Sequence, residues 1–278
     1  MFKYFFVIFF FFISVSHASD KLVVTSFYPI YLSTLNILDG AKEIKLINLT
    51  KETTGCLHDY QLTPQDMVIL SKANYFVVNG AGMESFLEKV IKTRKDLILI
   101  EASRGIKLDD GNPHVWLSPS LAIEQVKNIK DQLIVSFPEQ KELLEKNASR
   151  YISKIEKLRA TMKEELRTLR SRSFVTFHEA FPYFAQEFDL KITGVIEREP
   201  GTEPTSKELV QIVKKLKTNN DKVIFAEPQY SAKAAYTIAK ESGAKVYHLD
   251  PLVTGPWEKD AYLKGMKKNL EVIKEALK

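Results

Sequence analysis

Short runs of β-branched and aromatic residues alternate with segments of helical periodicity along most of the chain. Strands are predicted in two sets of four, at residues 22–26, 43–49, 75–79 and 97–101 in the first half and at 174–177, 191–196, 222–226 and 245–249 in the second. Helical patterns fill most of the gaps, for example at 63–72, which opens with Thr-Pro, and at 206–216. This alternation predicts an α/β fold of two lobes, each with a parallel sheet flanked by helices.

The longest helical pattern lies between the two sets of strands. Residues 139–170 contain neither Gly nor Pro, and apolar side chains recur every three or four positions from Leu144 to Leu169. This spacing predicts one amphipathic helix of about 30 residues, roughly 45 Å long. A continuous helix cannot bend like a hinge of several strands, so we expect a rigid connection with little closure of the lobes.

The first 18 residues have the pattern of a cleaved secretory signal. Lys3 precedes an unbroken apolar run at 5–13, and Ser16 and Ala18 place small residues before the expected cleavage point. The run is shorter than the ~20 residues of a membrane-spanning helix. Because no Cys lies near this point, we expect a periplasmic protein without a lipid anchor. The predicted organisation is a signal peptide (1–18), an N-terminal lobe (19–137), a linking helix (138–172) and a C-terminal lobe (173–278).

Composition narrows the chemistry. A single Cys excludes an intramolecular disulfide framework and a zinc site built on several thiolates. The net charge of +5 suggests a nucleic-acid partner at first sight. However, residues 141–172 hold 10 Lys and Arg against five Glu, so the excess belongs to the linking helix. A solvated helix face explains it, and we expect no nucleic-acid partner.

Chemistry-bearing side chains follow several of the predicted strands. His58, His114, His178 and Asp250 all lie just beyond strands, and ligands of open parallel sheets bind outside the carboxyl ends of strands. Three imidazoles and a carboxylate would form a tetrahedral site for a divalent ion, above all zinc. The four positions form no compact motif, so the residues alone leave open that each His is structural.

Several segments nevertheless match one family in order and spacing. They are HDYQLTPQDMVILSKANYFVVNGAGME at 58–84, NPHVWLSP at 112–119, FVTFHEAFPYFAQEFDL at 174–190, GTEPTSKEL at 201–209, VIFAEPQYS at 223–231 and LDPL at 249–252. The chain resembles the cluster A-I (cluster 9) solute-binding proteins of ABC importers for zinc, manganese and iron. The resemblance implies two α/β lobes joined by one long rigid helix, with a metal cleft between them and delivery of the metal to a membrane permease.

The resemblance also implies the ligands. His58, His114, His178 and Asp250 occupy the matching positions. A His at the third position is associated with zinc in this family and a Glu with manganese, so His178 favours Zn²⁺, with Mn²⁺ possible. We expect a monomer with no catalytic activity. The His-rich loop of many zinc-specific relatives is absent, because residues 80–113 contain no His.

Three further residues lie close to the expected ligands in the sequence. Glu227 ends a strand and is expected to orient an imidazole N–H, with direct metal ligation as the alternative. Cys56 could supply a thiolate but is expected to be a small buried side chain. His248 could compete as a ligand, although a packed or hydrogen-bonded His is the stronger expectation.

Three other functions remain open at this point. One is a manganese- or iron-binding member of the same family, and another is a surface adhesin, a label that some relatives have carried. The third is a secreted zinc-dependent hydrolase, in which three His and an open water position would be catalytic, with Glu227 or Glu179 as general base. The sequence has no HExxH motif, which counts against the hydrolase.

Overall fold

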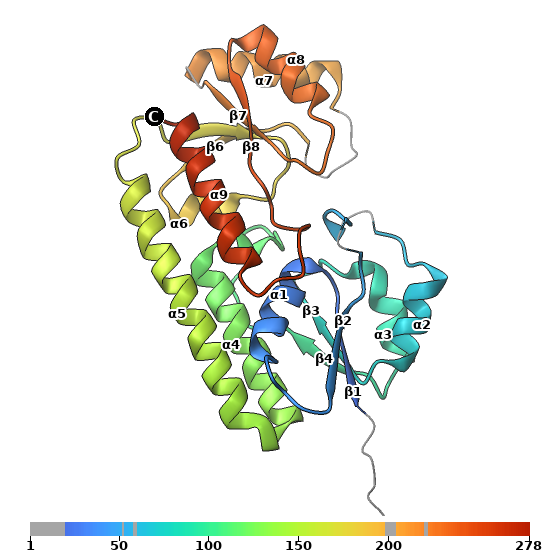
Figure 1. Ribbon diagram of the computed structural model, residues 1–278. Coiled ribbons are helices and arrows are strands. Elements are labelled where there is room, and N and C mark those ends of the chain that lie inside the picture. Colours follow the sequence, from blue (N-terminus) through green and yellow to red (C-terminus); the bar gives the residue numbers. More distant parts are fainter. Residues whose placement is uncertain (1–19, 52, 58–59, 198–203, 220–221) are drawn as a thin grey trace, which may run out of the picture.

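The computed structural model describes residues 20–278 except 52, 58–59, 198–203 and 220–221. It contains two four-stranded sheets, and every strand pair within them is parallel. All eight strands lie within two residues of their predicted bounds. The predicted α/β class and its two-lobed arrangement are therefore confirmed (Figure 1).

The first sheet has the strand order β2-β1-β3-β4. Its strands are β1 (Lys21–Thr25), β2 (Ile44–Asn48), β3 (Tyr75–Val78) and β4 (Ile98–Glu101). The helices of this half are α1 (Tyr28–Ile37), α2 (Pro64–Lys72), α3 (Glu88–Thr93) and α4 (Pro119–Ser136). Helix α2 begins where its sequence predicts, because Thr63, the residue before Pro64, forms a reciprocal capping box with Asp66 in the first turn.

The second sheet repeats this topology with the order β6-β5-β7-β8. Its strands are β5 (Ser173–Thr176), β6 (Lys191–Val195), β7 (Val223–Ala226) and β8 (Lys245–His248). The helices of this half are α6 (Pro182–Glu187), α7 (Ser206–Asn219), α8 (Lys233–Ser242) and α9 (Ala261–Ala276). In each sheet the strand order changes direction between the two central strands, β1 and β3 or β5 and β7, and parallel sheets bind ligands outside the carboxyl ends of their strands near that point.

The linking helix is α5 (Lys141–Leu166), which follows a short 3-10 helix at Pro138–Gln140. Its 26 residues span about 39 Å, somewhat less than the predicted length. It ends at Leu166 because the Arg172 guanidinium donates hydrogen bonds to the carbonyls of Leu166 and Arg167, at 3.0 and 3.2 Å.

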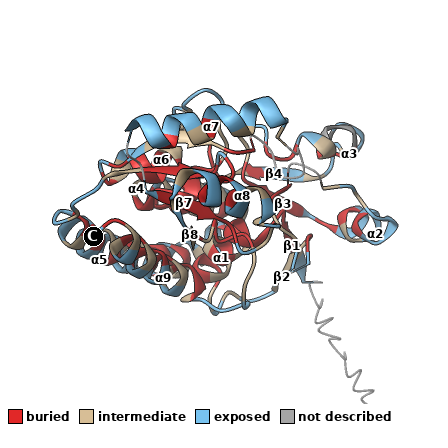
Figure 2. Cartoon of the chain, turned by 90° about the horizontal axis from the view of Figure 1, so that it is seen from above, coloured by how far each residue is buried: buried red, intermediate tan, exposed pale blue. Residues whose placement is uncertain are grey.

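One hydrophobic core runs through both lobes. The inner face of α5, including Tyr151, Ile155 and Met162, packs into the same cluster as Phe27 of the first half and Leu270 of α9. Figure 1 shows α9 beside α5, next to α1, so the last helix of the chain lies against the first lobe. Figure 2 shows buried residues gathered between the elements, while α7 exposes its outer side. This shared core supports the expectation of a rigid connection.

Glu187 makes a polar connection across the molecule. This residue ends α6, and its side chain is 5% exposed. Its carboxylate accepts hydrogen bonds from the Ser120 backbone N–H at 3.0 Å, the Ser120 hydroxyl at 2.6 Å, the Ser118 hydroxyl and Arg159 Nε. Burial raises the pKa of Glu187, but the bonds from Ser118, Ser120 and Arg159 outweigh it and hold the pKa below its usual range. The carboxylate thus ties α6 to the start of α4 and to α5.

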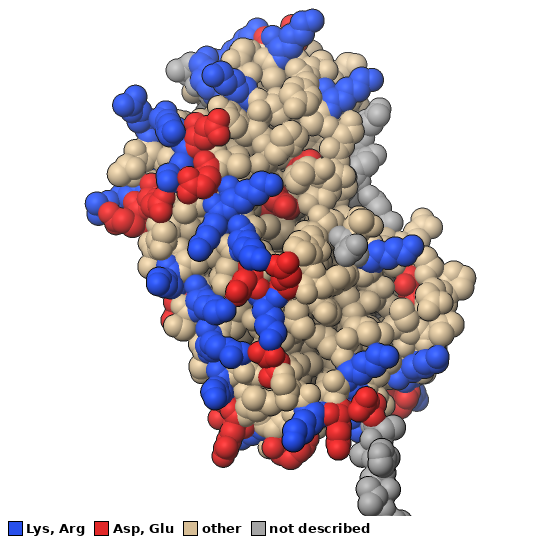
Figure 3. Space-filling view, in the orientation of Figure 1, with Lys and Arg blue, Asp and Glu red and all other residues tan. Residues whose placement is uncertain are grey.

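Acidic partners accompany the basic side chains of α5. Arg150 pairs with Asp39 at 2.8 Å, and Lys154 pairs with Asp260 at 2.8 Å. Figure 3 shows Lys and Arg gathered on this side of the molecule with Asp and Glu among them. This mixed surface agrees with a solvated helix face. In the described part of the chain, every helix is too short or too polar to cross a bilayer.

Candidate metal centre

His114 lies between β4 and the short 3-10 helix at Val115–Leu117, and it is 2% exposed. Its Nδ1 is 2.9 Å from Asn112 Oδ1, and its backbone N–H donates to the same oxygen at 3.0 Å. Asn112 Nδ2 donates to the Glu179 carbonyl at 2.7 Å, which fixes the orientation of the Asn112 amide. Because an amide oxygen only accepts, Nδ1 of His114 carries the proton and Nε2, which lies 3.3 Å from Cys56 Sγ, is the unprotonated ring nitrogen.

The loop after β3 supports this segment. Asn79 Nδ2 donates to the carbonyl of Pro113, next to His114, at 3.0 Å. The buried carboxylate of Glu84 holds the loop by accepting the backbone N–H groups of Asn79 and Gly80, at 2.7 and 3.0 Å. Burial raises the pKa of Glu84 to about 7, against the opposing effect of these hydrogen bonds. The motif NGAGME therefore holds the NPH segment in place through hydrogen bonds.

His178 follows β5 and is 1% exposed. The register of the second sheet pairs Thr176 with Phe225, and two residues further along this register His178 meets Glu227. His178 Nδ1 is 3.2 Å from Glu227 Oε1. When ionised, this carboxylate only accepts, so Nδ1 of His178 then donates to it and Nε2 is the unprotonated ring nitrogen.

The surroundings of Glu227 also locate Asp250. Burial raises the pKa of Glu227, contact with His178 opposes that rise, and the negative charge of Asp250 adds to it. Asp250 therefore lies near enough to act on Glu227 electrostatically. The structure brings these three residues of the second lobe into one region.

The two imidazoles from different lobes also meet. The ring centroids of His114 and His178 are 4.9 Å apart, with their planes at 79°. Imidazoles that share one zinc ion at Zn–N distances of about 2.0–2.1 Å have centroids about 5 Å apart. The pair is therefore spaced as two ligands of a single ion would be.

Asp250 follows β8 and is held from several sides. Its Oδ1 accepts hydrogen bonds from Gln229 Nε2 at 2.9 Å and from the Leu252 backbone N–H at 2.8 Å. Its backbone N–H and carbonyl both bond the side chain of Asn269 in α9, at 3.0 and 2.7 Å. The carboxylate is thus fixed in direction, with both bonds on the same oxygen.

The remaining candidates fall outside this arrangement or at its edge. His58 lies outside the described residues, and within the described ranges no three His, Cys, Asp or Glu side chains are close enough to form a metal site by themselves. Cys56 is buried, as expected, and its Sγ is 3.3 Å from His114 Nε2. His248 is exposed at the end of β8.

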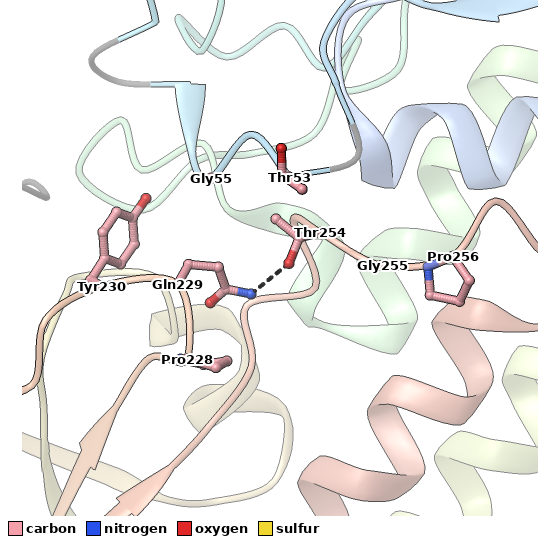
Figure 4. A pocket seen from close by; sticks show the side chains of 8 residues that line it. All are labelled: Thr53, Gly55, Pro228, Gln229, Tyr230, Thr254, Gly255 and Pro256. Carbon is pink, nitrogen blue, oxygen red and sulfur yellow. Dashed lines mark hydrogen bonds between the residues drawn. The ribbon is translucent and has the colours of Figure 1, made fainter.

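A pocket of about 560 Å³ adjoins these residues between the lobes. Figure 4 shows it, lined by Thr53, Gly55, Pro228, Gln229, Tyr230, Thr254, Gly255 and Pro256. The Cys56 backbone N–H donates to the Tyr230 hydroxyl at 2.9 Å across it. The lobes approach closely here because residue 55 is Gly; a Cβ on it would lie 2.8 Å from that hydroxyl.

Further contacts join the lobes beside the site. Trp116 Nε1 donates to the Pro251 carbonyl at 2.8 Å, and the Tyr262 hydroxyl donates to the Trp116 carbonyl at 3.0 Å. These bonds fix the segment that carries His114 against the segment that carries Asp250.

Three supporting residues were not predicted from the sequence. Asn112, Gln229 and Asn269 orient His114 and Asp250 through amide groups. The first two lie within the segments NPHVWLSP and VIFAEPQYS, which could have marked them, whereas Asn269 has no local signal because it lies in α9.

Residues 23–276 match the model of one protein family, described as zinc-uptake complex component A, periplasmic. The chain belongs to this family. The high-affinity zinc uptake system protein ZnuA of Bacillus subtilis (strain 168) is 33% identical over 290 residues, covering 95% of this chain and 90% of that protein. The zinc-binding lipoprotein AdcA of Streptococcus pneumoniae (strain R6) is 31% identical over 93% of this chain, which spans 56% of the length of AdcA.

Solved structures agree with the family. The laminin-binding protein Lmb of Streptococcus agalactiae, described as bifunctional with adhesin and metal-transporting activity, has a TM-score of 0.83 at 32% identity, with 93% of this chain and all of Lmb covered. Zn(II)-bound AdcA from S. pneumoniae has a TM-score of 0.79 at 32% identity, covering 93% of this chain and 58% of that one. The predicted family is confirmed.

Proposed function

We propose that this protein captures a zinc ion outside the cytoplasm and delivers it to the permease of an ABC importer. One observation carries the proposal: two buried imidazoles from different lobes, His114 and His178, lie 4.9 Å apart between ring centroids. Each has a side-chain oxygen at Nδ1, so Nε2 is the ring nitrogen that we propose binds the metal.

The proposed ligands are His58, His114, His178 and one oxygen of Asp250. Three neutral imidazoles and a carboxylate form a closed tetrahedral set for zinc, with no open position for an activated water. Glu227 then acts through His178, as the carboxylate that fixes its ring. The zinc ion is then the transported ligand and not a resident cofactor.

The proposed ligand atoms also favour binding of one metal over another. Imidazole nitrogen suits zinc better than manganese, whose divalent ion favours oxygen ligands, so Mn²⁺ is the weaker alternative. The family and the relatives named above are zinc-uptake and metal-transport proteins, which leaves the hydrolase without support.

The proposal includes the compartment and the domain bounds of the protein. A cleaved signal at 1–18 would export the chain to the periplasm, where it would act as a monomer without a nucleic-acid partner. We place the N-terminal lobe at 19–137, the linking helix at 138–172 and the C-terminal lobe at 173–278.

Zinc should stabilise the purified metal-free protein. An ion that binds only the folded state adds about 2.7 kcal/mol at 100 times its Kd, so the melting temperature should rise clearly with a slight excess of zinc. Calorimetric titration should give one zinc ion per chain. A protein with neither a melting shift nor heat of binding would contradict the proposal.

A further inference from the structure

Within the described residues, the donors that bond the Asp250 carboxylate both bond one of its two oxygens. Both Gln229 Nε2 and the Leu252 backbone N–H donate to Oδ1. The Gln229 amide is itself held, because Nε2 also donates to the Thr254 hydroxyl at 3.0 Å (Figure 4). Asn269 fixes the Asp250 backbone on both sides. Oδ1 is therefore committed to hydrogen bonds, and Oδ2 is the oxygen left to ligate a metal.

We infer that Gln229 is a positioning residue that sets metal selectivity by restricting Asp250 to ligation through one oxygen. The inference rests on the proposed function, in which Asp250 is a ligand. It goes beyond that function by assigning to an uncharged neighbour the choice between metals.

The physical reason is coordination number. Zinc is satisfied by four ligands in a tetrahedron, so one Asp250 oxygen completes a site with three imidazoles. Manganese favours more ligands, oxygen among them, and a bidentate carboxylate would supply one. A donor that occupies Oδ1 withholds this oxygen from the metal, which penalises manganese and leaves zinc unaffected.

The neighbouring pocket strengthens the effect. Gln229 and Thr254 both line the 560 Å³ space between the lobes (Figure 4). Truncation of Gln229 would remove one of the two donors to Oδ1, so that only the Leu252 backbone N–H remains and one lone pair of Oδ1 becomes available to a metal. It would also extend this space toward Asp250, so that water could approach the metal. Both consequences raise the coordination number and so favour manganese over zinc.

The test is a competitive titration of the full metal-free chain with Zn²⁺ and Mn²⁺. Gln229→Ala should lower the ratio of the manganese Kd to the zinc Kd about tenfold. Gln229→Met should also lower it, because it keeps the volume of the side chain and removes the donor. Thr254→Val is the matched control: it removes the other partner of the same amide without touching Asp250, and the ratio should stay as in the unmodified protein.

A second readout reports coordination directly. In Co²⁺-loaded protein, the visible absorption should be intense in the unmodified chain, as for a tetrahedral ion, and weaker in Gln229→Ala. A general loss of packing would weaken both metals together and leave the ratio unchanged. A ratio within twofold of the unmodified protein in both Gln229 variants would overturn the inference. Failure of the unmodified protein to bind zinc would instead overturn the proposed function.

Discussion

Replacement of His178 by Ala should weaken zinc binding more than about 100-fold, because even residues that only orient a ligand contribute 10- to 100-fold to metal affinity. The variant removes a buried imidazole that faces His114 across the lobes, and no other His of the described second lobe is buried. Competition with a chromophoric zinc chelator measures the loss.

His248→Ala is the matched control for this experiment. His248 belongs to the same lobe but is exposed at the end of β8, so its removal should leave zinc affinity unchanged. Tight stoichiometric zinc binding by His178→Ala would exclude His178 as a ligand. Equal losses in both variants would show that the experiment reports something other than ligation.

Replacement of Glu187 by Ala should lower the free energy of unfolding by about 2 kcal/mol, since it removes the acceptor of the Ser118 and Ser120 hydroxyls and the partner of the half-buried Arg159. The change leaves Arg159, Ser118 and Ser120 without their shared carboxylate. Urea unfolding at neutral pH measures the effect, with Glu179→Ala as control because Glu179 is exposed in the same part of the chain.

The effect of this substitution should depend on pH in one direction. The pKa of Glu187 is held below its usual range in the folded state, so its contribution to stability is fully present above the unfolded carboxyl pKa of about 4.3. It is lost as the pH falls through the lower, folded pKa, and the two proteins should converge in acid. A difference that grows on acidification would contradict the assigned role.

The strands were predictable because their burial leaves a strong local signal. Strands β3 and β7 are buried along their whole length, and YFVV and VIFA are apolar runs of the kind that parallel sheets require. The end of α5 was not predictable in the same way. Arg172 stops the helix by bonding its last carbonyls, and that contact depends on how the chain returns after Leu166.

The hydrophobic pattern of the sequence also did not predict which distant elements pack against each other. The apolar face of α9 predicts that the helix is half-buried, but nothing in it shows that it lies against α5 and α1 of the other half. The shared core of the two lobes follows from this placement, so the stiffness of the connection depends on α9 as well as on the linking helix.

Some residues of the candidate site were predictable from the sequence, and others were not. The sequence could point to four residues of the site, because His and carboxylate side chains just beyond the ends of parallel strands mark the edge where ligands bind. They are His114, His178, Glu227 and Asp250. The amides that orient them carry no such signal, because Asn and Gln serve in many surface turns. The 3.3 Å approach of Cys56 to His114 also required the fold, since it depends on how the loop before residue 58 returns to the NPH segment.

Anomalous diffraction at the zinc absorption edge, from crystals of the zinc-loaded protein, would locate the ion and its ligands. We expect one zinc peak between the lobes, bound by nitrogens of His58, His114 and His178 at about 2.0–2.1 Å and by a single oxygen of Asp250. A peak elsewhere, or one that has Cys56 Sγ or an open water position in place of Asp250, would contradict this expectation.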